Sequence, residues 1–466
     1  MTSNPPQRHG PDSGRSRIAA PPPSQDRGGF RRLVILVAIL VVAIVIPLWP
    51  NHMLPAARRT LGIFLFACLA WITEVLPIWV TGGLVVAALA ALAAPVTSAL
   101  SSKQVLGLFA SPVVVLFAGG YFLAAGLHKH GLDRALAAAV VSRSGHKPRF
   151  VLAGMMAATA FLSMWMSNTA ATALMISVVL PMVEVMGADP FAKALILGVP
   201  FAANVGGMAT PVGTPPNAIA MDVLTRTGST VSFLDWVVVG LPAAIILTIF
   251  IWWLLCLTHR PKVQRIVIEV ERQRLRRPQM IVIGTLVATV VLWLTTSLHH
   301  VSSGVCALLP PAVFFSTGIL DRDDLKSIGW DVLVLMAGGI ALGVAMQKTG
   351  LSAWFMTASH LHAISPEVLV LILAVAVLLL STFMSNTSAA NVVIPLAVAS
   401  GAAMPAGAML VAFMASSAMS LPVSTPPNAI AYGTGFISSK DLMRPGMVIG
   451  ALALAVNWAV VSLIAQ

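Results

Sequence analysis

Long apolar runs separated by short polar segments dominate the chain. Each run is long enough to cross the hydrocarbon core of a bilayer as a helix, which needs about 17–25 residues. The apolar–polar alternation of a membrane β-barrel does not occur. The pattern predicts an all-helical, polytopic membrane protein. About eleven crossings are expected, near residues 33–49, 60–76, 78–95, 111–128, 191–221, 236–257, 280–297, 304–320, 331–347, 406–434 and 445–465.

Two apolar regions, 150–183 and 366–403, are too long for one crossing and are interrupted by small polar residues. Each carries the triplet Ser-Asn-Thr near its middle, at 167–169 and again at 385–387. A re-entrant helical hairpin, which enters and leaves on the same side, fits this pattern better than two full crossings. Irregular backbone at this depth is tolerated only where it is buried in protein or lines a cavity. The triplets therefore predict two hairpin tips inside the membrane.

Two further motifs recur in the same order as the triplets. The segment 113–132 matches 332–351 around a shared Ala-Gly-Gly, and GTPPNAIA at 213–220 matches STPPNAIA at 424–431. Small residues such as those of Ala-Gly-Gly allow helices to approach closely, and we expect that role for them. Consecutive prolines remove hydrogen-bond donors and cannot continue a helix, so Thr-Pro-Pro-Asn predicts a break in each copy.

The three repeated motifs define two homologous halves, 60–257 and 280–466. The predicted broken helices occupy 191–221 in the first half and 406–434 in the second. An odd number of membrane passages separates the equivalent spans, so the halves are expected to run oppositely through the bilayer. Inverted repeats of this kind are typical of secondary transporters, which bind their substrates near the midplane between discontinuous helices.

Composition and charge remove the soluble alternatives and predict a topology. The 466 residues are 58% hydrophobic and 9% charged, against roughly 25% charged in soluble domains. The net charge of +12 comes mainly from basic residues gathered in particular loops, which indicates membrane topology rather than a nucleic-acid surface. With the N-terminus in the cytoplasm and each hairpin counted as zero crossings, 23 of the 28 Lys and Arg residues lie inside. The C-terminus is then expected outside.

The segments that flank the halves follow from the same pattern. Residues 1–32 are expected to form a disordered, basic cytoplasmic tail. Residues 33–50 are expected to form an extra N-terminal span, and 258–279 a cytoplasmic linker. The first apolar run has no small-residue cleavage site, which favours a retained span and the inner (plasma) membrane of a bacterium.

The polar residues at the tips and breaks indicate ion binding. Helix ends leave backbone groups unpaired. Free N–H groups at the positive end of a helix dipole suit an anion, whereas free carbonyls with Ser and Asn oxygens suit a hard cation such as Na⁺. No Lys or Arg lies in the triplets or the Thr-Pro-Pro-Asn motifs, so a dianion there would be costly to desolvate. We expect bound cations to compensate its charge, which couples the anion to Na⁺.

These motifs are similar to those of the divalent anion:sodium symporter family, which carries di- and tricarboxylates and, in some branches, sulfate. The resemblance covers nearly all of the chain after residue 55. It implies a cytoplasmic hairpin at 150–183, an outer hairpin at 366–403 and two Na⁺ sites beside one substrate. It also implies a homodimer in which a transport domain slides, as an elevator, against a dimerising scaffold.

The same resemblance implies binding roles for individual residues. The substrate carboxylates would contact the triplets and the broken helices, through Ser167, Asn168, Thr169, Thr214, Ser385, Asn386, Thr387, Thr425 and Pro426. The first Na⁺ would lie among Ser163, Ser167, Asn168 and Gly213. The second would lie among Ser381, Met384 through its backbone, Asn386 and Ser424. Many relatives have Thr-Glu where this chain has Ser-Thr at 381–382, so a sodium-independent exchanger stays open.

The leading interpretation is a Na⁺-coupled importer of a C4-dicarboxylate such as succinate. A Na⁺/sulfate symporter is the nearest alternative, because tetrahedral sulfate can use the same hydroxyls and helix ends; a dicarboxylate exchanger is the next. A membrane-embedded enzyme would need a nucleophile or metal motif, and neither HExxH nor GxSxG occurs. The expected partners are a small anion, the lipid bilayer and a second copy of the chain, with no organic cofactor and no nucleic acid.

Overall fold

The computed structural model describes residues 27–48, 53–226, 228–229, 231–266, 276–358, 364–399 and 405–464. The regular structure of these residues is helical, and none of them lies in a strand. The all-helical class predicted from the sequence is confirmed. Of the predicted tail at 1–32, residues 1–26 lie outside the described residues, and α1 begins directly after them. Of the predicted linker at 258–279, residues 267–275 also lie outside.

Most of the helices follow one another with short connections. Helix α1 (Arg27–Leu48) precedes the two halves. In the first half the helices are α2 (Pro55–Thr73), α3 (Ile78–Ala88), α4 (Ser102–Gly107), α5 (Pro112–Lys129), α6 (Leu132–Arg143), α7 (Pro148–Ser163), α8 (Asn168–Met186), α9 (Pro190–Gly206), α10 (Pro215–Arg226) and α11 (Phe233–Thr258). In the second half they are α12 (Arg277–Leu294), α13 (Thr296–His299), α14 (Ser303–Cys306), α15 (Leu309–Ser316), α16 (Arg322–Ser327), α17 (Trp330–Lys348), α18 (Leu351–Ala358), α19 (Pro366–Phe383), α20 (Asn386–Ala399), α21 (Ala406–Ser416), α22 (Pro426–Gly433) and α23 (Ser439–Ile464).

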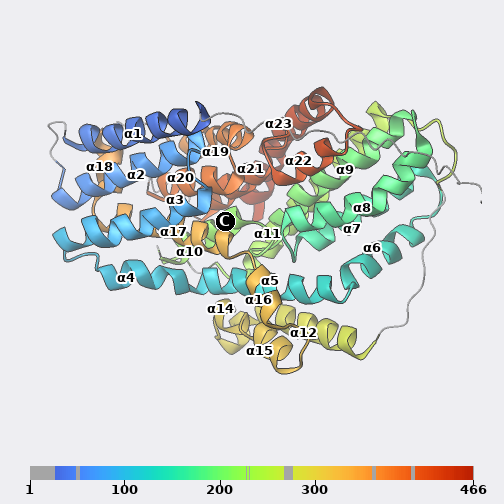
Figure 1. Ribbon diagram of the computed structural model, residues 1–466, viewed down its shortest axis with the longest axis horizontal. Helices are drawn as coiled ribbons and strands as arrows, with labels where there is room; N and C mark the ends of the chain where they lie inside the picture. Colours follow the sequence, from blue (N-terminus) through green and yellow to red (C-terminus); the bar gives the residue numbers. More distant parts are fainter. Residues whose placement is uncertain are drawn as a thin grey trace, which may run out of the picture.

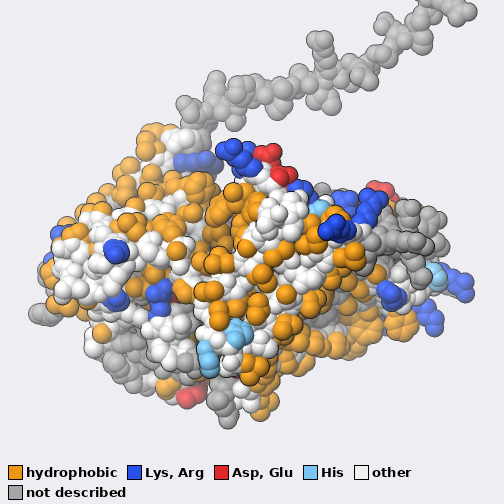
Figure 2. Space-filling view, turned by 90° about the horizontal axis from the view of Figure 1, so that it is seen from below, with side chains coloured by type: hydrophobic (Ala, Val, Ile, Leu, Met, Phe, Trp, Pro, Cys, Tyr) orange, Lys and Arg blue, Asp and Glu red, His pale blue; other side chains and the backbone are white. Residues whose placement is uncertain are grey.

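Eleven helices in the described part of the chain are long and apolar enough to cross a membrane, and the hairpin arms α8 and α19 are among them. Hydrophobic side chains spread over much of the face in Figure 2, with Lys and Arg mostly near its margins. The chain is therefore a multi-pass membrane protein. The single span expected at 304–320 is instead made of the short helices α14 and α15. Pro310 lies in the first turn of α15, where its missing N–H starts a new helix rather than extending α14.

Two helices form the centre of the molecule. Within their apolar windows, 94% of the residues in Pro190–Ala209 and 72% of those in α17 are buried, against 11% in α1 at the periphery. The buried helix α9 packs against α7, α8, α11 and α22, and α17 packs against α3, α10 and α20. Both central helices are less hydrophobic than α1, because a helix surrounded by protein can carry polar residues whereas a peripheral helix must present apolar side chains to lipid.

The Ala-Gly-Gly motifs pack closely against other helices at equivalent positions. A methyl group on Gly119 of α5 would collide with the backbone of Ala307, just after α14. A methyl group on Gly338 of α17 would collide with the backbone of Gly82 in α3. The role in close helix packing that the sequence predicted for these glycines is therefore confirmed.

The two hairpins lie on opposite sides of the middle of the long axis. Figure 1 shows α7 and α8 in its right half and α19 and α20 in its left half. The helices that follow the two breaks cross over between the halves: α10 packs against the second hairpin arm α20, and α22 packs against the first hairpin arm α8. This reciprocal packing brings both hairpins and both broken helices into one core.

Ion pairs tie the two halves together outside this core. The ammonium of Lys129, at the end of α5, lies 2.7 Å from a carboxylate oxygen of Asp321 and also pairs with Asp324, at the start of α16. Lys193 of α9 pairs with Asp441 of α23 at 3.0 Å. The Lys129 ammonium and the backbone N–H groups of Asp324 and Asp323 lower the pKa of the Asp321 carboxyl to about 2.

Candidate functional site

The first hairpin breaks at the Ser-Asn-Thr triplet. Helix α7 ends at Ser163 and α8 begins at Asn168, while Ser167 caps α8 by accepting a hydrogen bond from the N–H of Ala170 at 3.2 Å. The hydroxyl oxygen of Ser163 lies 2.6 Å from Oδ1 of Asn168 and 2.7 Å from the carbonyl oxygen of Ala203. Its single proton can serve only one of these two acceptors. Three oxygens thus meet at the tip with one proton between them, an arrangement that suits a bound cation.

The first broken helix lies directly against this tip. Helix α9 ends at Gly206, and a 3₁₀ turn (Gly207–Ala209) and an irregular loop lead to α10. The hydroxyl of Thr210 donates to the carbonyl of Met164 at the hairpin tip, at 2.6 Å. Oδ1 of Asn168 lies directly over the Cα of Gly207, and Gly213 lies against the backbone of Gly207. Both glycines are required here, because a side chain on Gly207 would collide with the amide of Asn168 and a side chain on Gly213 would collide with the backbone of Gly207.

Asn217, the asparagine of the first Thr-Pro-Pro-Asn motif, holds the break open. Its side-chain nitrogen lies 3.0 Å from the carbonyl oxygen of Gly207, 3.3 Å from that of Met208 and 2.8 Å from that of Thr210. These are carbonyls that the interrupted helix no longer pairs. Within this motif the prolines stop the helix, and the asparagine donates hydrogen bonds to carbonyls that have lost their helical partners.

The second hairpin repeats this construction with a different hydrogen-bond pattern. Helix α19 ends at Phe383, Met384 is extended, and α20 begins at Asn386. Ser385 accepts a hydrogen bond from the N–H of Ser388 at 3.1 Å. The hydroxyl of Ser381 and Oδ1 of Asn386 are both buried, and neither has a partner among the described residues. They are the equivalents of Ser163 and Asn168, so each half offers the same two oxygens at its tip.

The second broken helix contacts the second tip in the same way. The hydroxyl of Ser424 donates to the carbonyl of Thr382 at 2.8 Å, as Thr210 does to the first tip. The side-chain nitrogen of Asn428 lies 2.9 Å from the carbonyl of Met419 and 3.0 Å from that of Leu421. In the sequence alignment of the halves these two carbonyls are equivalent to those of Met208 and Thr210. The repeated motif thus has the same bracing role twice.

Four helices begin at the site. The N-termini of α8, α20, α10 and α22 lie at the triplets and at the Thr-Pro-Pro-Asn motifs, and α22 is capped by Thr425. The start of each helix presents free N–H groups and the positive end of the dipole, which favours an anion. Thr214 and Thr425 are each 3% exposed, whereas Pro426 is exposed. Anion-binding groups thus occur beside both candidate cation clusters.

A cavity of about 770 Å³ reaches the first hairpin tip. Ser167 and Thr169 line it, and so do Tyr121 of α5, Arg134 of α6 and Asp331 of α17. The other residues predicted to bind substrate are not part of its lining. The structure therefore places one face of the first triplet at an accessible cavity and keeps the second triplet, Thr214 and Thr425 apart from it.

A sequence model of the citrate transporter family, CitMHS, matches residues 68–415 of the chain. The chain belongs to the citrate transporter family. The resemblance to the divalent anion:sodium symporters predicted from the motifs is confirmed by this match and by relatives named sodium-dependent dicarboxylate transporters. This member of the citrate transporter family is a transporter, not an enzyme.

Individual relatives align over most of this citrate transporter family member. It is 29% identical to the sodium-dependent dicarboxylate transporter SdcS of Staphylococcus saprophyticus, over 91% of the chain and 89% of the relative. It is 31% identical to the inorganic phosphate transporter PHO87 of Saccharomyces cerevisiae, over 81% of the chain and 43% of that protein. Among solved structures, the YdaH transporter of Alcanivorax borkumensis has the same fold, with a TM-score of 0.56 at 14% identity, covering 87% of this chain and 98% of the other.

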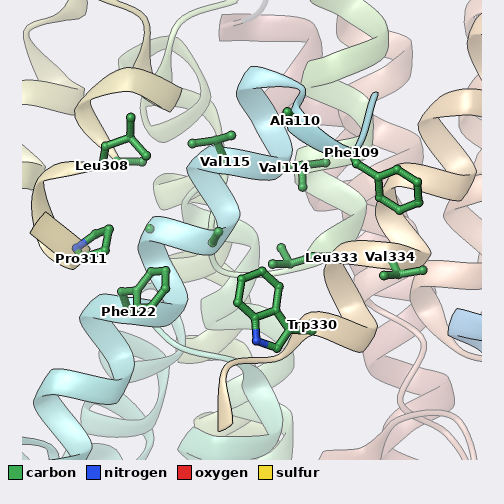
Figure 3. A pocket seen from close by; sticks show the side chains of 13 residues that line it. Phe109, Ala110, Val114, Val115, Phe122, Leu308, Pro311, Trp330, Leu333 and Val334 are labelled. Carbon is green, nitrogen blue, oxygen red and sulfur yellow. The ribbon is translucent and has the colours of Figure 1, made fainter. Parts of the chain in front are cut away.

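A second cavity in this citrate transporter family member has a different character. It has a volume of about 330 Å³ and lies between α5, α15 and α17, where Phe122, Pro311 and Trp330 face it (Figure 3). The side chains around it are almost entirely apolar. An anion would find no hydrogen-bond donor to replace its water there, so this cavity is not a substrate site.

Two residues of the site were not predicted from the sequence. Thr210 connects the first break to the first tip, and Asn204 of α9 extends from the first half to Thr425 of the second at 3.2 Å. Asn204 is the only strongly polar side chain in the interior of α9 between Lys193 and the break, and a polar residue inside an apolar helix is a signal that sequence reasoning can use.

Proposed function

We propose that this chain is a Na⁺-coupled symporter of divalent organic anions, with a C4-dicarboxylate such as succinate as its substrate. The observation that carries the proposal is the pair of oxygen clusters at the broken hairpin tips. In one cluster a single hydroxyl proton lies among three oxygens, and in the other two buried oxygens have no partner in the described structure. Oxygens without protons or donors are the ligands of hard cations.

The cations occupy the two clusters in this proposal. The first Na⁺ lies among Ser163, Ser167, Asn168 and Gly213, where the hydrogen-bond geometry already gathers oxygens. The second Na⁺ lies among its equivalents, Ser381, Met384, Asn386 and Ser424. The oxygens of Ser381 and Asn386 are buried and unpaired, so binding a cation there removes an existing penalty rather than adding one.

The anion lies between the two clusters and contacts the helix N-termini. Hydroxyl and amide donors come from both triplets and from Thr214 and Thr425, and Pro426 forms part of the wall. The triplets and the Thr-Pro-Pro-Asn motifs contain no Lys or Arg, so the two cations compensate most of the substrate charge. The dicarboxylate relatives in Staphylococcus support this substrate class, because their names state a sodium-dependent dicarboxylate transporter.

The transport cycle is proposed to be an elevator movement of one domain against a dimerising scaffold. The inverted halves, a cytoplasmic N-terminus, an outside C-terminus, the homodimer and a bacterial inner membrane belong to the same proposal. The opposite placement of the two hairpins along the long axis supports the inverted arrangement (Figure 1). The concentration of Lys and Arg in the loops predicted to face the cytoplasm supports this orientation of the chain in the membrane.

A second candidate is an inorganic oxyanion as the substrate. The relative in Saccharomyces cerevisiae named as an inorganic phosphate transporter favours this reading. Tetrahedral oxyanions use the same donors, namely hydroxyls and helix N-termini. The two candidates differ in the distance between charged groups of the substrate. A dicarboxylate has two carboxylates separated by a carbon chain, whereas phosphate and sulfate carry their charge on a single group.

Uptake into proteoliposomes tests the proposal. Succinate uptake should require an inward Na⁺ gradient and should be abolished by Asn168→Ala or Asn386→Ala, with both variants still folded in detergent. The same preparation, screened for thermal stabilisation by succinate, citrate, sulfate and phosphate with and without Na⁺, identifies the substrate class through linkage. Succinate uptake that is unchanged in sodium-free buffer at fixed pH would contradict the coupling, and stabilisation by phosphate or sulfate alone would favour the second candidate.

A further inference from the structure

Asn204 lies where the two halves meet, in the most deeply buried of the candidate membrane spans that the structure describes. Its side chain is fully buried. Its side-chain nitrogen is 3.2 Å from the hydroxyl oxygen of Thr425 and 3.5 Å from Oδ1 of Asn428, both in the second half. The residue before it, Ala203, has its carbonyl 2.7 Å from the hydroxyl of Ser163 at the first hairpin tip. Two consecutive residues of α9 thus contact a predicted cation ligand of one half and a predicted substrate ligand of the other.

The contact with Asn204 determines what the Thr425 hydroxyl can do. That oxygen also accepts a hydrogen bond from the backbone N–H of Asn428 at 3.3 Å. A hydroxyl has two acceptor lone pairs and one donor proton. With both lone pairs occupied by N–H donors, only the proton is left, and it can be given to an anion. Asn204 therefore makes Thr425 a dedicated donor, the form that a carboxylate needs.

We propose that Asn204 is a positioning residue that couples occupancy of the first cation cluster to the affinity of the substrate site. A cation held by Ser163 and Asn168 draws on the carbonyl of Ala203 and so fixes this turn of α9. The fixed turn holds the amide of Asn204 against Thr425. The inference rests on the proposed function, since it assumes that a cation and an anion bind at these places.

The contact made by Asn204 has no counterpart in the second half. The residue equivalent to Asn204 in the second half is Ala415, which is fully buried and has no side-chain donor for Thr214. The first cation cluster is therefore connected to the substrate ligand of the opposite half, whereas the second cluster has no corresponding side chain. Loss of Asn204 should then affect the first cluster's influence on the substrate and spare the second.

The test measures succinate affinity of the detergent-purified full chain at low and at saturating Na⁺. In the wild type, Na⁺ should raise the affinity within the range of about 5–150-fold that is usual for coupled sites. Asn204→Leu, which keeps the shape and removes the amide, should bring this factor closer to one, by at most about tenfold, the effect of about one hydrogen bond. Asn204→Ser, too short to contact Thr425, should show the same loss and serves if the first variant does not fold.

Two controls separate positioning from general damage. Thr289→Val removes a fully buried hydroxyl of α12 that bonds only to its own helix, and it should leave the Na⁺ effect unchanged. Asn204→Leu added to Thr425→Val should cause no further loss of the Na⁺ effect than Thr425→Val alone, because both act through one hydroxyl.

The outcomes are distinct. The inference is overturned, while the proposed function stands, if the wild type shows the Na⁺ effect and Asn204→Leu keeps it. The same holds if Asn204→Leu lowers the succinate affinity equally at both Na⁺ concentrations. If succinate binding to the wild type does not depend on Na⁺, the proposed function fails, and the inference fails with it.

Discussion

Replacing Asn217 by Leu should destabilise the protein because it removes the donors that brace the first broken helix. Three carbonyl oxygens lie 2.8–3.3 Å from its side-chain nitrogen, which has two protons to give. Two of these carbonyls keep another donor, the indole N–H of Trp236 or the backbone N–H of Gly213, so one is left without a donor, at a cost of about 1–3 kcal/mol. The second lost hydrogen bond costs about 0.5–1.5 kcal/mol more. Oδ1 of Asn217 is buried without a partner, so its removal returns about 1–2 kcal/mol. The expected net loss is about 1–2 kcal/mol.

Thermal unfolding in detergent measures this loss, and Asn391 provides the matched control. Asn391 is also fully buried, but neither atom of its amide group has a partner in the described structure. Asn391→Leu should therefore leave the unfolding temperature unchanged or raise it. For a chain of 466 residues, about 1 kcal/mol corresponds to about 1 °C, so Asn217→Leu should lower the unfolding temperature by about 1–2 °C. Equal losses in both variants, or none in Asn217→Leu, would refute the bracing role.

Three further predictions test other contacts. Gly213→Ala places a methyl group on the carbonyl of Gly207 and should reduce Na⁺-dependent uptake about tenfold or more, measured with the Na⁺ concentration for half-maximal rate. Gly338→Ala should cost about 1–3 kcal/mol by separating α17 from α3, whereas Gly107→Ala, which meets nothing within 4 Å, should not destabilise. The pKa of Asp321 is lowered to about 2, so the ionised carboxylate stabilises the folded protein fully above the ordinary pKa of an aspartate. This stabilisation disappears as the pH falls through about 2. Asp321→Asn should therefore lower the unfolding temperature equally at about pH 5 and about pH 8, and a pH-dependent difference would contradict the assignment.

The sequence was sufficient for the features that depend on local chemistry. Consecutive prolines and a polar triplet interrupt a helix wherever they lie, so the breaks near Asn168, Pro215, Asn386 and Pro426 could be predicted from the chain alone. Repetition then predicted that the broken segments form equivalent pairs. The fold class, the family and the transporter class are confirmed for the same reason, because each depends on motifs or composition. The binding roles of the individual residues stay predictions.

The remaining features depend on contacts between distant segments, which spacing does not reveal. Thr210 and Met164 are 46 residues apart, and Asn204 and Thr425 are 221 apart. The prediction of one span at 304–320 failed for a different reason. Its hydropathy suggested one helix, but Pro310 starts a separate helix. Asn217 shows an intermediate case: its motif marked the break, but its hydrogen bonds to the freed carbonyls became visible only in the structure.

The lack of basic side chains in the four motifs has a consequence for how coupling is enforced. A site containing Arg or Lys would attract a dianion whether or not Na⁺ were present, and the carrier could then move the anion alone. A site made of hydroxyls, amides and helix N-termini attracts the dianion only weakly, because each contributes a partial charge. Two bound Na⁺ ions bring the substrate and site close to neutrality, which lowers the cost of taking the charge out of water. Under the proposed function, the absence of a fixed positive charge from the four motifs prevents the substrate from being carried without its cations. Introducing one Lys beside a triplet, as in Thr169→Lys, should therefore raise anion binding in the absence of Na⁺ while weakening its dependence on Na⁺.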